Sequence, residues 1–301
     1  MNTARRLAVA AVLVMGASLA VQGSAVLTHP MFAELGASGV SGLRFLLAAG
    51  LAVALVRPRW AGRSTTSWTW IVIYGSIIAA MNVAMYRALE HLPLGVAVTI
   101  ELLGPLALGA TRLPRRWLRG LPLVSVAGLV LVARPDSDLP VIGLVFAGCA
   151  AAALAAYAVV AERISTMTTG NGWDELALAL VVAAAWTLPL SWHALPTLGV
   201  THLPRLLVAA GVGVLLAFSL DFLAVRRSSA RIVAVLLSFD PVLGAALGWV
   251  FMAQTLSVAT LLGIGLIVTA GVATCAWHTE GTSRAGHEGT AATGRLGSAG
   301  D

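Results

Sequence analysis

Charge is scarce in this chain. Only 11% of the 301 residues are charged, whereas 58% are hydrophobic and the mean hydropathy is +0.90. A soluble globular domain carries about 25% charged residues, so lipid is the expected solvent. A helix of roughly 20 apolar residues crosses a bilayer. The chain up to residue 278 divides into about ten such runs, separated by short polar connections.

Lysine is absent, so all 19 basic residues are arginines, and the formal net charge is +6. In a soluble protein this charge would suggest a nucleic-acid partner. Here the arginines lie in the connections between apolar runs, without interleaved aromatic residues, and they indicate topology instead. We therefore expect no nucleic-acid partner and a lipid bilayer as the surroundings.

Cysteine is also rare. Cys149 and Cys275 both lie inside apolar runs, where a thiol behaves as a small hydrophobe, so we expect no disulfide, no metal site and no cofactor. An intramembrane enzyme needs a nucleophile with a base, or paired metal ligands. The chain lacks HExxH, GxSxG and paired-aspartate motifs, which predicts that the protein is not an enzyme.

The apolar runs predict ten membrane spans. With the N-terminus in the cytoplasm, fifteen arginines fall inside and three fall outside, while Arg44 lies within a span. Positive residues favour the cytoplasmic side, so we expect a multi-pass plasma-membrane protein with both termini in the cytoplasm. A cleaved signal peptide at the first run is the alternative, and it would leave nine spans. The predicted spans are 7–27, 39–56, 69–89, 93–110, 118–133, 141–161, 174–192, 203–224, 230–251 and 256–277.

The chain resembles itself at an offset of 136 residues, which aligns each of the first five spans with one of the last five and pairs Pro105 with Pro241. Five spans per half is an odd number, so the second half enters the membrane inverted. We expect an all-α fold of ten transmembrane helices, built as two inverted five-helix repeats around a central cavity. The expected units are 1–136, 137–278 and a disordered cytoplasmic tail over 279–301.

Four of the ionisable residues within the predicted spans stand out as candidates, since an ionisable side chain in hydrocarbon costs at least about 2.5 kcal/mol to insert. Glu101 precedes Pro105 by four residues, and proline leaves the carbonyl of Glu101 without its amide partner. This arrangement favours a cation or proton site facing a cavity. A carboxylate held by an arginine of a neighbouring helix is the structural alternative.

Asp240 directly precedes Pro241 at a depth similar to that of Glu101. It shares a helix face with Gly244 and Gly248, so close helix packing competes with a functional role. Arg44 could reach the interface, or it could bind a substrate carboxylate or Glu101. Asp221 lies close to Arg226 and Arg227, which favours an interfacial ion pair, with a gate as the alternative.

Four uncharged polar residues complete the candidate set. Each could contact substrate or merely bond between helices, and the second role is commoner for a single membrane Asn or Gln. Tryptophans at the predicted span ends, among them Trp68, Trp173 and Trp192, are expected to be interfacial anchors. The four uncharged candidates are Gln22, Asn82, Tyr86 and Tyr157.

The stretch ALEHLPLGVAVTIELLGPLALGA at residues 88–110 resembles the fourth-helix region of threonine and homoserine exporters, which are EamA-type drug/metabolite transporters. The similarity extends to GASGVSGLRF at 36–45 and SFDPVLGAALGWVF at 238–251, and it covers nearly the whole membrane domain. The resemblance implies ten helices in two inverted halves, alternating access, and proton-driven efflux of amino acids or related metabolites. In this chain, Asp240 and Gln254 replace carboxylates that the family commonly has as Glu.

The residues and the resemblance together predict a secondary exporter of small metabolites. An amino acid would place its carboxylate near Arg44 or a backbone amide and its ammonium near Glu101 or Asp240. Removal from water favours the neutral form of a carboxyl group, which would allow proton exchange. A drug exporter or an uptake facilitator of the same fold is the alternative function. The sequence leaves open the substrate, the coupling stoichiometry and a homodimer.

Overall fold

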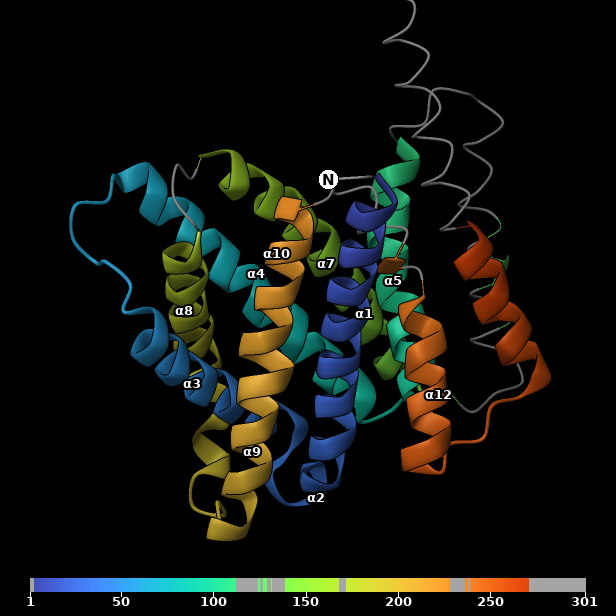
Figure 1. The fold of residues 1–301 in the computed structure, drawn as a ribbon. Helices are drawn as coiled ribbons and strands as arrows, with labels where there is room; N and C mark the ends of the chain where they lie inside the picture. Colours follow the sequence, from blue (N-terminus) through green and yellow to red (C-terminus); the bar gives the residue numbers. More distant parts are fainter. Residues whose placement is uncertain are drawn as a thin grey trace, which may run out of the picture.

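The computed structural model describes residues 3–111, 139–167, 172–227 and 239–270, with isolated positions between them at 124, 127, 128, 131, 236 and 237. Within these ranges the chain is helical and contains no strand (Figure 1). The fifth predicted span, 118–133, lies mostly outside the described residues, as does the tail over 279–301. The helices of the first half are α1 (Thr3–Thr28), η1 (His29–Met31), α2 (Phe32–Leu35), α3 (Ala37–Val56), α4 (Thr65–Leu89) and α5 (Leu94–Thr111).

The second half begins with two long helices, and its third membrane crossing has three consecutive parts. That crossing passes from an α-helical start through a π-helical turn into a second α-helical stretch. The helices are α7 (Val141–Met167), α8 (Trp173–Ser191), η3 (Trp192–Ala194), η4 (Val200–His202), α9 (Leu203–Ala210), η5 (Gly211–Leu216), α10 (Ala217–Arg227) and α12 (Asp240–Met252). A further apolar helix spans Val258–Ala270.

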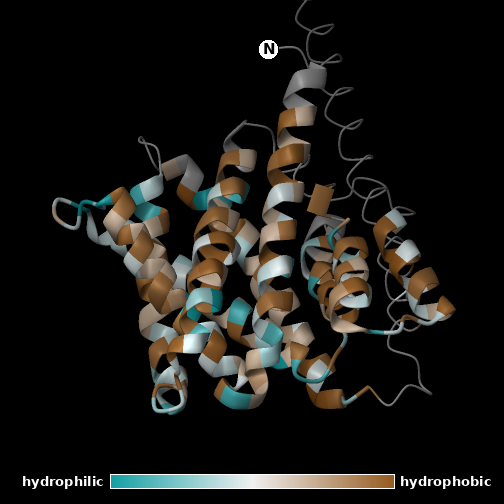
Figure 2. Ribbon diagram, turned by 60° about the horizontal axis from the view of Figure 1, so that its bottom comes forward, coloured by the Kyte–Doolittle hydropathy of each residue, from teal (hydrophilic) through white to brown (hydrophobic). Residues whose placement is uncertain are grey.

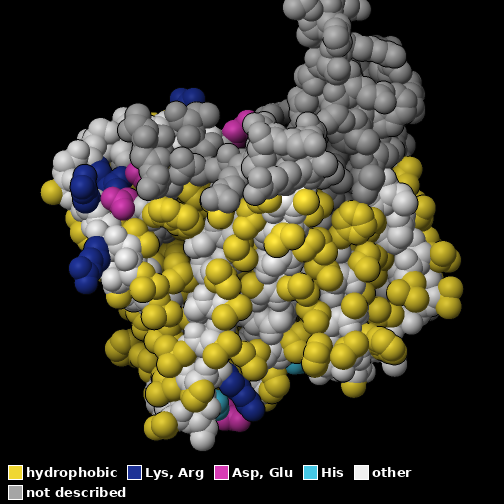
Figure 3. All heavy atoms as spheres, in the orientation of Figure 1, with side chains coloured by type: hydrophobic (Ala, Val, Ile, Leu, Met, Phe, Trp, Pro, Cys, Tyr) yellow, Lys and Arg dark blue, Asp and Glu magenta, His cyan; other side chains and the backbone are white. Residues whose placement is uncertain are grey.

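Six of the described helical segments are long and apolar enough to cross a membrane, and three shorter apolar helices accompany them. Figure 2 shows hydrophobic positions along the helices, with many of the hydrophilic ones in the turns at their ends. On the face drawn in Figure 3, apolar side chains cover the middle of the molecule, and the visible charged side chains gather toward its two ends. This distribution suits a bundle whose belt faces lipid.

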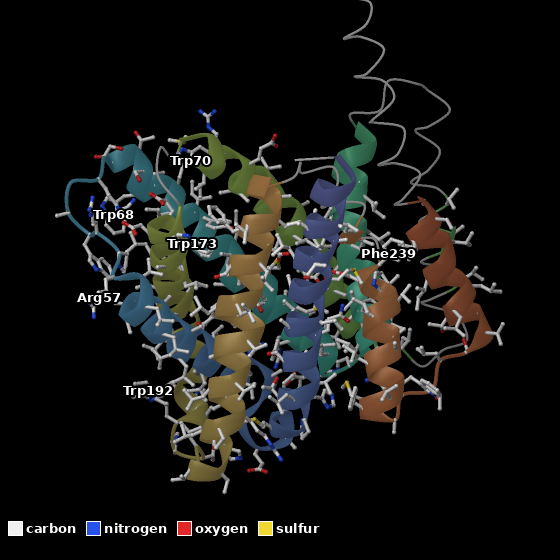
Figure 4. All side chains as sticks on the ribbon, in the orientation of Figure 1. Arg57, Trp68, Trp70, Trp173, Trp192 and Phe239 are labelled. Atoms are coloured by element: carbon white, nitrogen blue, oxygen red, sulfur yellow. The ribbon has the colours of Figure 1, made fainter. Side chains whose placement is uncertain are left out.

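Tryptophans mark both ends of this belt. In Figure 4, Trp68, Trp70 and Trp173 lie toward one end of the bundle, and Trp192 lies nearer the other. Trp192 is 67% exposed, and the guanidinium carbon of Arg163 lies 5.9 Å from the centroid of the Trp70 ring. These positions agree with the prediction that the tryptophans anchor the helices at the interfaces.

Small residues allow the helices to approach closely. A Cβ atom on Gly42 of α3 would lie 2.6 Å from the carbonyl oxygen of Thr187 on α8, and one on Gly95 of α5 would lie 2.7 Å from the Cα of Ala245 on α12. In lipid, such close backbone packing replaces the hydrophobic effect as a source of helix association. The α3–α8 and α5–α12 pairs are therefore fixed by glycine.

The helix contacts repeat between the two halves. The contact of α4 with α7 corresponds to that of α10 with α1, and the contact of α5 with α7 corresponds to that of α12 with α1. The contact of α4 with α8 likewise corresponds to the contacts of α9 and η5 with α3. The pairs α3–α8 and α5–α12 join equivalent positions of the two predicted halves. These pairs correspond when the predicted halves are exchanged, whereas the α3–α4 and α4–α5 contacts have no equally extensive counterpart among the described helices of the second half.

One predicted span differs from the structure in a way that matters for the site. The sequence predicts a continuous helix over 230–251 with Pro241 in its interior, but a turn at Phe239 interrupts it and α12 begins at Asp240. Pro241 thus occupies the first turn of α12, where its missing N–H would have no partner in any case. The prediction of one continuous helix over 230–251, with Pro241 in its interior, is therefore wrong.

Candidate substrate site

Asp240 lies at the first turn of α12 and is held by α1. Its Oδ1 atom accepts a hydrogen bond of 2.5 Å from Ser18 Oγ, and its backbone carbonyl accepts one of 3.0 Å from Gln22 Nε2. Ser18 and Gln22 lie four residues apart, so both point from one face of α1. Helix α1 therefore fixes both the carboxylate and the backbone at the start of α12.

Glu101 lies in α5, the helix that packs on α12, and its side chain is half-buried. Pro105 is inside the helix, so the Glu101 carbonyl lacks the amide that would normally bond to it. Glu101 and Asp240 lie on helices that contact each other. No arginine in the described part of the chain pairs with Glu101, which argues against the arginine-held alternative.

Packing brings α1, α5 and α12 together around these carboxylates. A Cβ atom on Gly244 would lie 2.6 Å from Gln22 Oε1, 3.3 Å from Val98 Cγ2 and 3.4 Å from the Cα of Gly95. Gln22 Oε1 is itself buried and has no hydrogen-bond partner. Only glycine fits at position 244 without displacing the amide that bonds to Asp240.

Arg44 forms a second group with Tyr86 and Thr28. Its guanidinium carbon lies 4.7 Å from the centroid of the Tyr86 ring, and the Tyr86 hydroxyl lies 3.2 Å from Thr28 Oγ1. Arg44 is only 1% exposed, so the prediction that it could extend to the membrane interface is wrong.

The Arg44 guanidinium is poorly satisfied. Nη2 donates one long bond of 3.5 Å to the carbonyl of Gly213 in the π-helical turn η5, while Nε and Nη1 are buried without a partner. Among the described residues Arg44 pairs with no carboxylate, including Glu101. A buried cation with spare donors is suited to bind an anionic group.

Asp221 lies in α10, and its Oδ1 atom is buried without a hydrogen-bond partner. The ion pair with Arg226 or Arg227 that the sequence favours lies outside the described residues, because the side chains of both arginines do. Phe218 lies three residues before Asp221 in α10, and its ring centroid is 5.9 Å from that of Tyr157. The Tyr157 ring stacks on that of Tyr74 with centroids 5.3 Å apart.

The structure therefore brings most of the sequence candidates into three neighbouring groups. Asn82 joins none of them, because its Nδ2 donates a 3.3 Å bond to the carbonyl of Ile78 within its own helix. Sequence reasoning missed Ser18 and Thr28, since a serine or threonine in an apolar run carries no distinguishing signal. It also missed Tyr74, whose role depends on a ring from another helix.

Gln254 has a structural role at the end of α12. Its Oε1 atom accepts a 3.1 Å bond from the backbone amide of Leu94, the first residue of α5, and so satisfies one of the free donors of that helix. Glu90 acts similarly on α3, accepting a 3.1 Å bond from the amide of Ala37.

Across the described ranges, no three His, Cys, Asp or Glu residues come together as a metal site.

A helical membrane bundle with unpaired charges in its interior is typical of a transporter, and comparisons with known proteins agree. Residues 141–274 match the profile of the EamA-like transporter family. The resemblance to EamA transporters that the sequence motifs indicated is thereby confirmed for the second half of the chain.

Curated relatives extend the similarity across both halves. The chain is 28% identical over 272 residues to the threonine/homoserine exporter RhtA of Escherichia coli K12, which covers 86% of this chain and 88% of that protein. It is also 28% identical over 251 residues to the pseudopaline exporter CntI of Pseudomonas aeruginosa PAO1, covering 80% and 87%. The protein is a multi-pass membrane protein related to metabolite exporters.

A solved crystal structure has the same fold. It superposes with a TM-score of 0.62 at 21% identity, and the match covers 90% of this chain and 98% of the other. At this identity the likeness shows the fold alone.

Proposed function

We propose that the protein is a secondary active transporter that exports amino acids or related small metabolites, of the threonine/homoserine type. The observation that carries the proposal is the pair of half-buried acidic residues on two helices that pack together, Glu101 on α5 and Asp240 on α12, in a chain similar to exporters over most of its length. Neither group has a basic partner among the described residues. Transport, rather than catalysis, is the proposed activity.

The architecture proposed for this function is an inverted repeat of ten helices around a central cavity, with units at 1–136 and 137–278. The exchangeable pattern of helix neighbours supports it. So does the interruption at Phe239, because transporters built from inverted repeats commonly place their sites at broken helices near the midplane. The arginine distribution supports cytoplasmic termini in the plasma membrane.

Proton coupling follows from the chemistry of the carboxylates. Two like charges close together in a water-poor interior disfavour double ionisation, so one group readily retains a proton. We propose that the substrate ammonium displaces this proton at Glu101 or Asp240 and that the proton returns when access alternates. Each proton moved inward gains about 2.3 kcal/mol per 100 mV of membrane potential.

Arg44 is proposed to take the anionic end of the substrate. Its Nε and Nη1 donors have no protein partner, and a carboxylate accepts two parallel bonds from a guanidinium. Since these donors are buried in this conformation, the proposal requires α3 or η5 to move during access. The π-helical turn at η5 suits such a role because π-turns are frequent at functional sites.

The test is efflux from proteoliposomes that contain the purified protein and are preloaded with a panel of labelled amino acids. We expect loss of threonine, homoserine or a relative that accelerates when a proton gradient is imposed. Movement of no amino acid on the panel would refute the proposal. The similarity to the pseudopaline exporter makes pseudopaline the second candidate substrate, and it would be tested in the same vesicles.

A further inference from the structure

Asp221 lies three residues from Phe218 on one face of α10, beside an aromatic enclosure formed by rings from three helices. Phe218 lies in α10, Tyr74 lies in α4, and Tyr157 lies in α7. The rings of Tyr74 and Tyr157 stack at 5.3 Å with an interplanar angle of 22°, and the Phe218 ring is tilted against Tyr157 at 5.9 Å. Tyr74 and Phe218 belong to one buried cluster, and Tyr157 packs against it.

One oxygen of the Asp221 carboxylate has no partner beside this enclosure. Asp221 Oδ1 is buried and has no hydrogen-bond partner, and the described chain contributes no basic side chain to it. A buried acceptor without a partner is rare in folded proteins and destabilises the fold unless a ligand or water satisfies it.

The surroundings favour a cation as that ligand. The faces of aromatic rings attract cations, and a primary ammonium offers three donors to carboxylate and hydroxyl oxygens. An anion would meet Asp221 itself, while a neutral apolar group would leave Oδ1 unsatisfied. The unpaired carboxylate oxygen and the neighbouring aromatic rings thus suit the charge of an organic ammonium group.

This enclosure is separate from the group around Arg44. The Arg44 guanidinium bonds to the carbonyl of Gly213, and Asp221 lies eight residues further along the same helical run. Eight residues of helix advance about 12 Å. The two ends of one α-amino acid are much closer together than this, so a single small substrate does not engage Arg44 and Asp221 at once.

We propose that Asp221, Tyr74, Tyr157 and Phe218 form a binding site for the primary ammonium group of a transported metabolite, one stage removed from the Arg44 site on the same path. The inference rests on the proposed export function for its physiological ligand. It deepens that function by requiring an amine in the substrate class. It also predicts that an amine without a carboxylate binds to this site.

The experiment is calorimetric titration of the purified full-length protein in detergent with n-propylammonium, and separately with propionate as a probe that lacks the amine. We expect wild type to bind n-propylammonium, and D221N to bind it about tenfold more weakly or worse. Y157L should weaken binding similarly, whereas Y157F, which keeps the ring, should bind as wild type does. Propionate binding should be unchanged by D221N.

Two controls keep the result interpretable. Gel filtration tests whether D221N remains monodisperse, and W249L removes an aromatic ring that is 67% exposed and outside the enclosure. Equal n-propylammonium binding by wild type and D221N, or none by wild type, would overturn the site. Binding that depends on Asp221 without efflux of any amine-bearing metabolite would refute the exporter and leave the site standing.

Discussion

The crossing of α5 and α12 positions both central carboxylates, and Gly95→Ala tests it. The added Cβ would lie 2.7 Å from the Cα of Ala245 and 2.9 Å from its N and Cβ atoms. Carbon atoms pack at about 3.5 to 4.0 Å, so the two helices must separate by roughly 1 Å. All three atoms are backbone or Cβ, so no flexible side chain can move aside to relieve the contact.

Overpacking of this kind costs about 1 to 3 kcal/mol. At about 2 to 4 °C per kcal/mol for a chain of this size class, the midpoint of thermal unfolding should fall by roughly 2 to 12 °C. The measurement is thermal unfolding of the purified protein in detergent, followed by the loss of monodisperse material. Gradient-driven efflux should fall as well, because Glu101 and Asp240 would shift relative to each other.

Gly50→Ala is the matched control. Gly50 lies in α3, and its Cβ would meet nothing within 4 Å, so alanine there should leave stability unchanged or raise it by about 0.5 to 1 kcal/mol. If Gly95→Ala unfolded at the same temperature as Gly50→Ala, the close α5–α12 crossing would be refuted.

Three further substitutions test the polar groups. Ser18→Ala removes a hydrogen bond to the Asp240 carboxylate, and such a bond is worth about 1.5 to 3 kcal/mol. Efflux by this variant should therefore slow by about tenfold or more, whereas Ser18→Thr, which keeps the hydroxyl, should retain activity. Equal efflux rates for the two variants would contradict the role of the hydroxyl. Gln254→Leu removes the acceptor for the Leu94 amide and should lower the free energy of unfolding by about 1 kcal/mol. Gln254→Glu keeps an acceptor oxygen and should leave the stability unchanged. An equal loss of stability in both variants would contradict the role of Gln254 in capping α5. Arg44→Met should leave the stability unchanged or raise it, because a poorly paired buried charge contributes little to stability. The same variant should lose efflux. A large drop in stability would instead show that the charge of Arg44 has a structural role.

The sequence predicts the helices well because membrane helices are set by local composition. The span predicted at 39–56 is observed as Ala37–Val56, and that predicted at 174–192 as Trp173–Ser191. Length and hydropathy are properties of one segment and need no partner. The interruption at Phe239 was missed because Pro241 fits either the interior of a kinked helix or the first turn of a new one.

The site was predicted only in part, because its contacts join segments that are far apart in the sequence. Ionisable residues inside apolar runs are visible in the sequence, so Glu101, Asp240, Arg44 and Asp221 were identified as candidates. Their partners come from distant segments: Ser18 bonds to Asp240 across 222 positions of the chain. No local pattern indicates which side chain meets which, so the burial of Arg44 and the aromatic surroundings of Asp221 required the structure.

The measurement that tests the central claim most directly is proton-gradient-driven efflux of labelled threonine from proteoliposomes containing Glu101→Gln. Glutamine has nearly the same shape but carries neither charge nor an exchangeable acid proton. The account predicts that this variant stays folded and loses gradient-driven efflux, whereas Glu34→Gln, at a side chain that is 65% exposed, behaves as wild type. Undiminished, gradient-dependent efflux by Glu101→Gln would contradict the account.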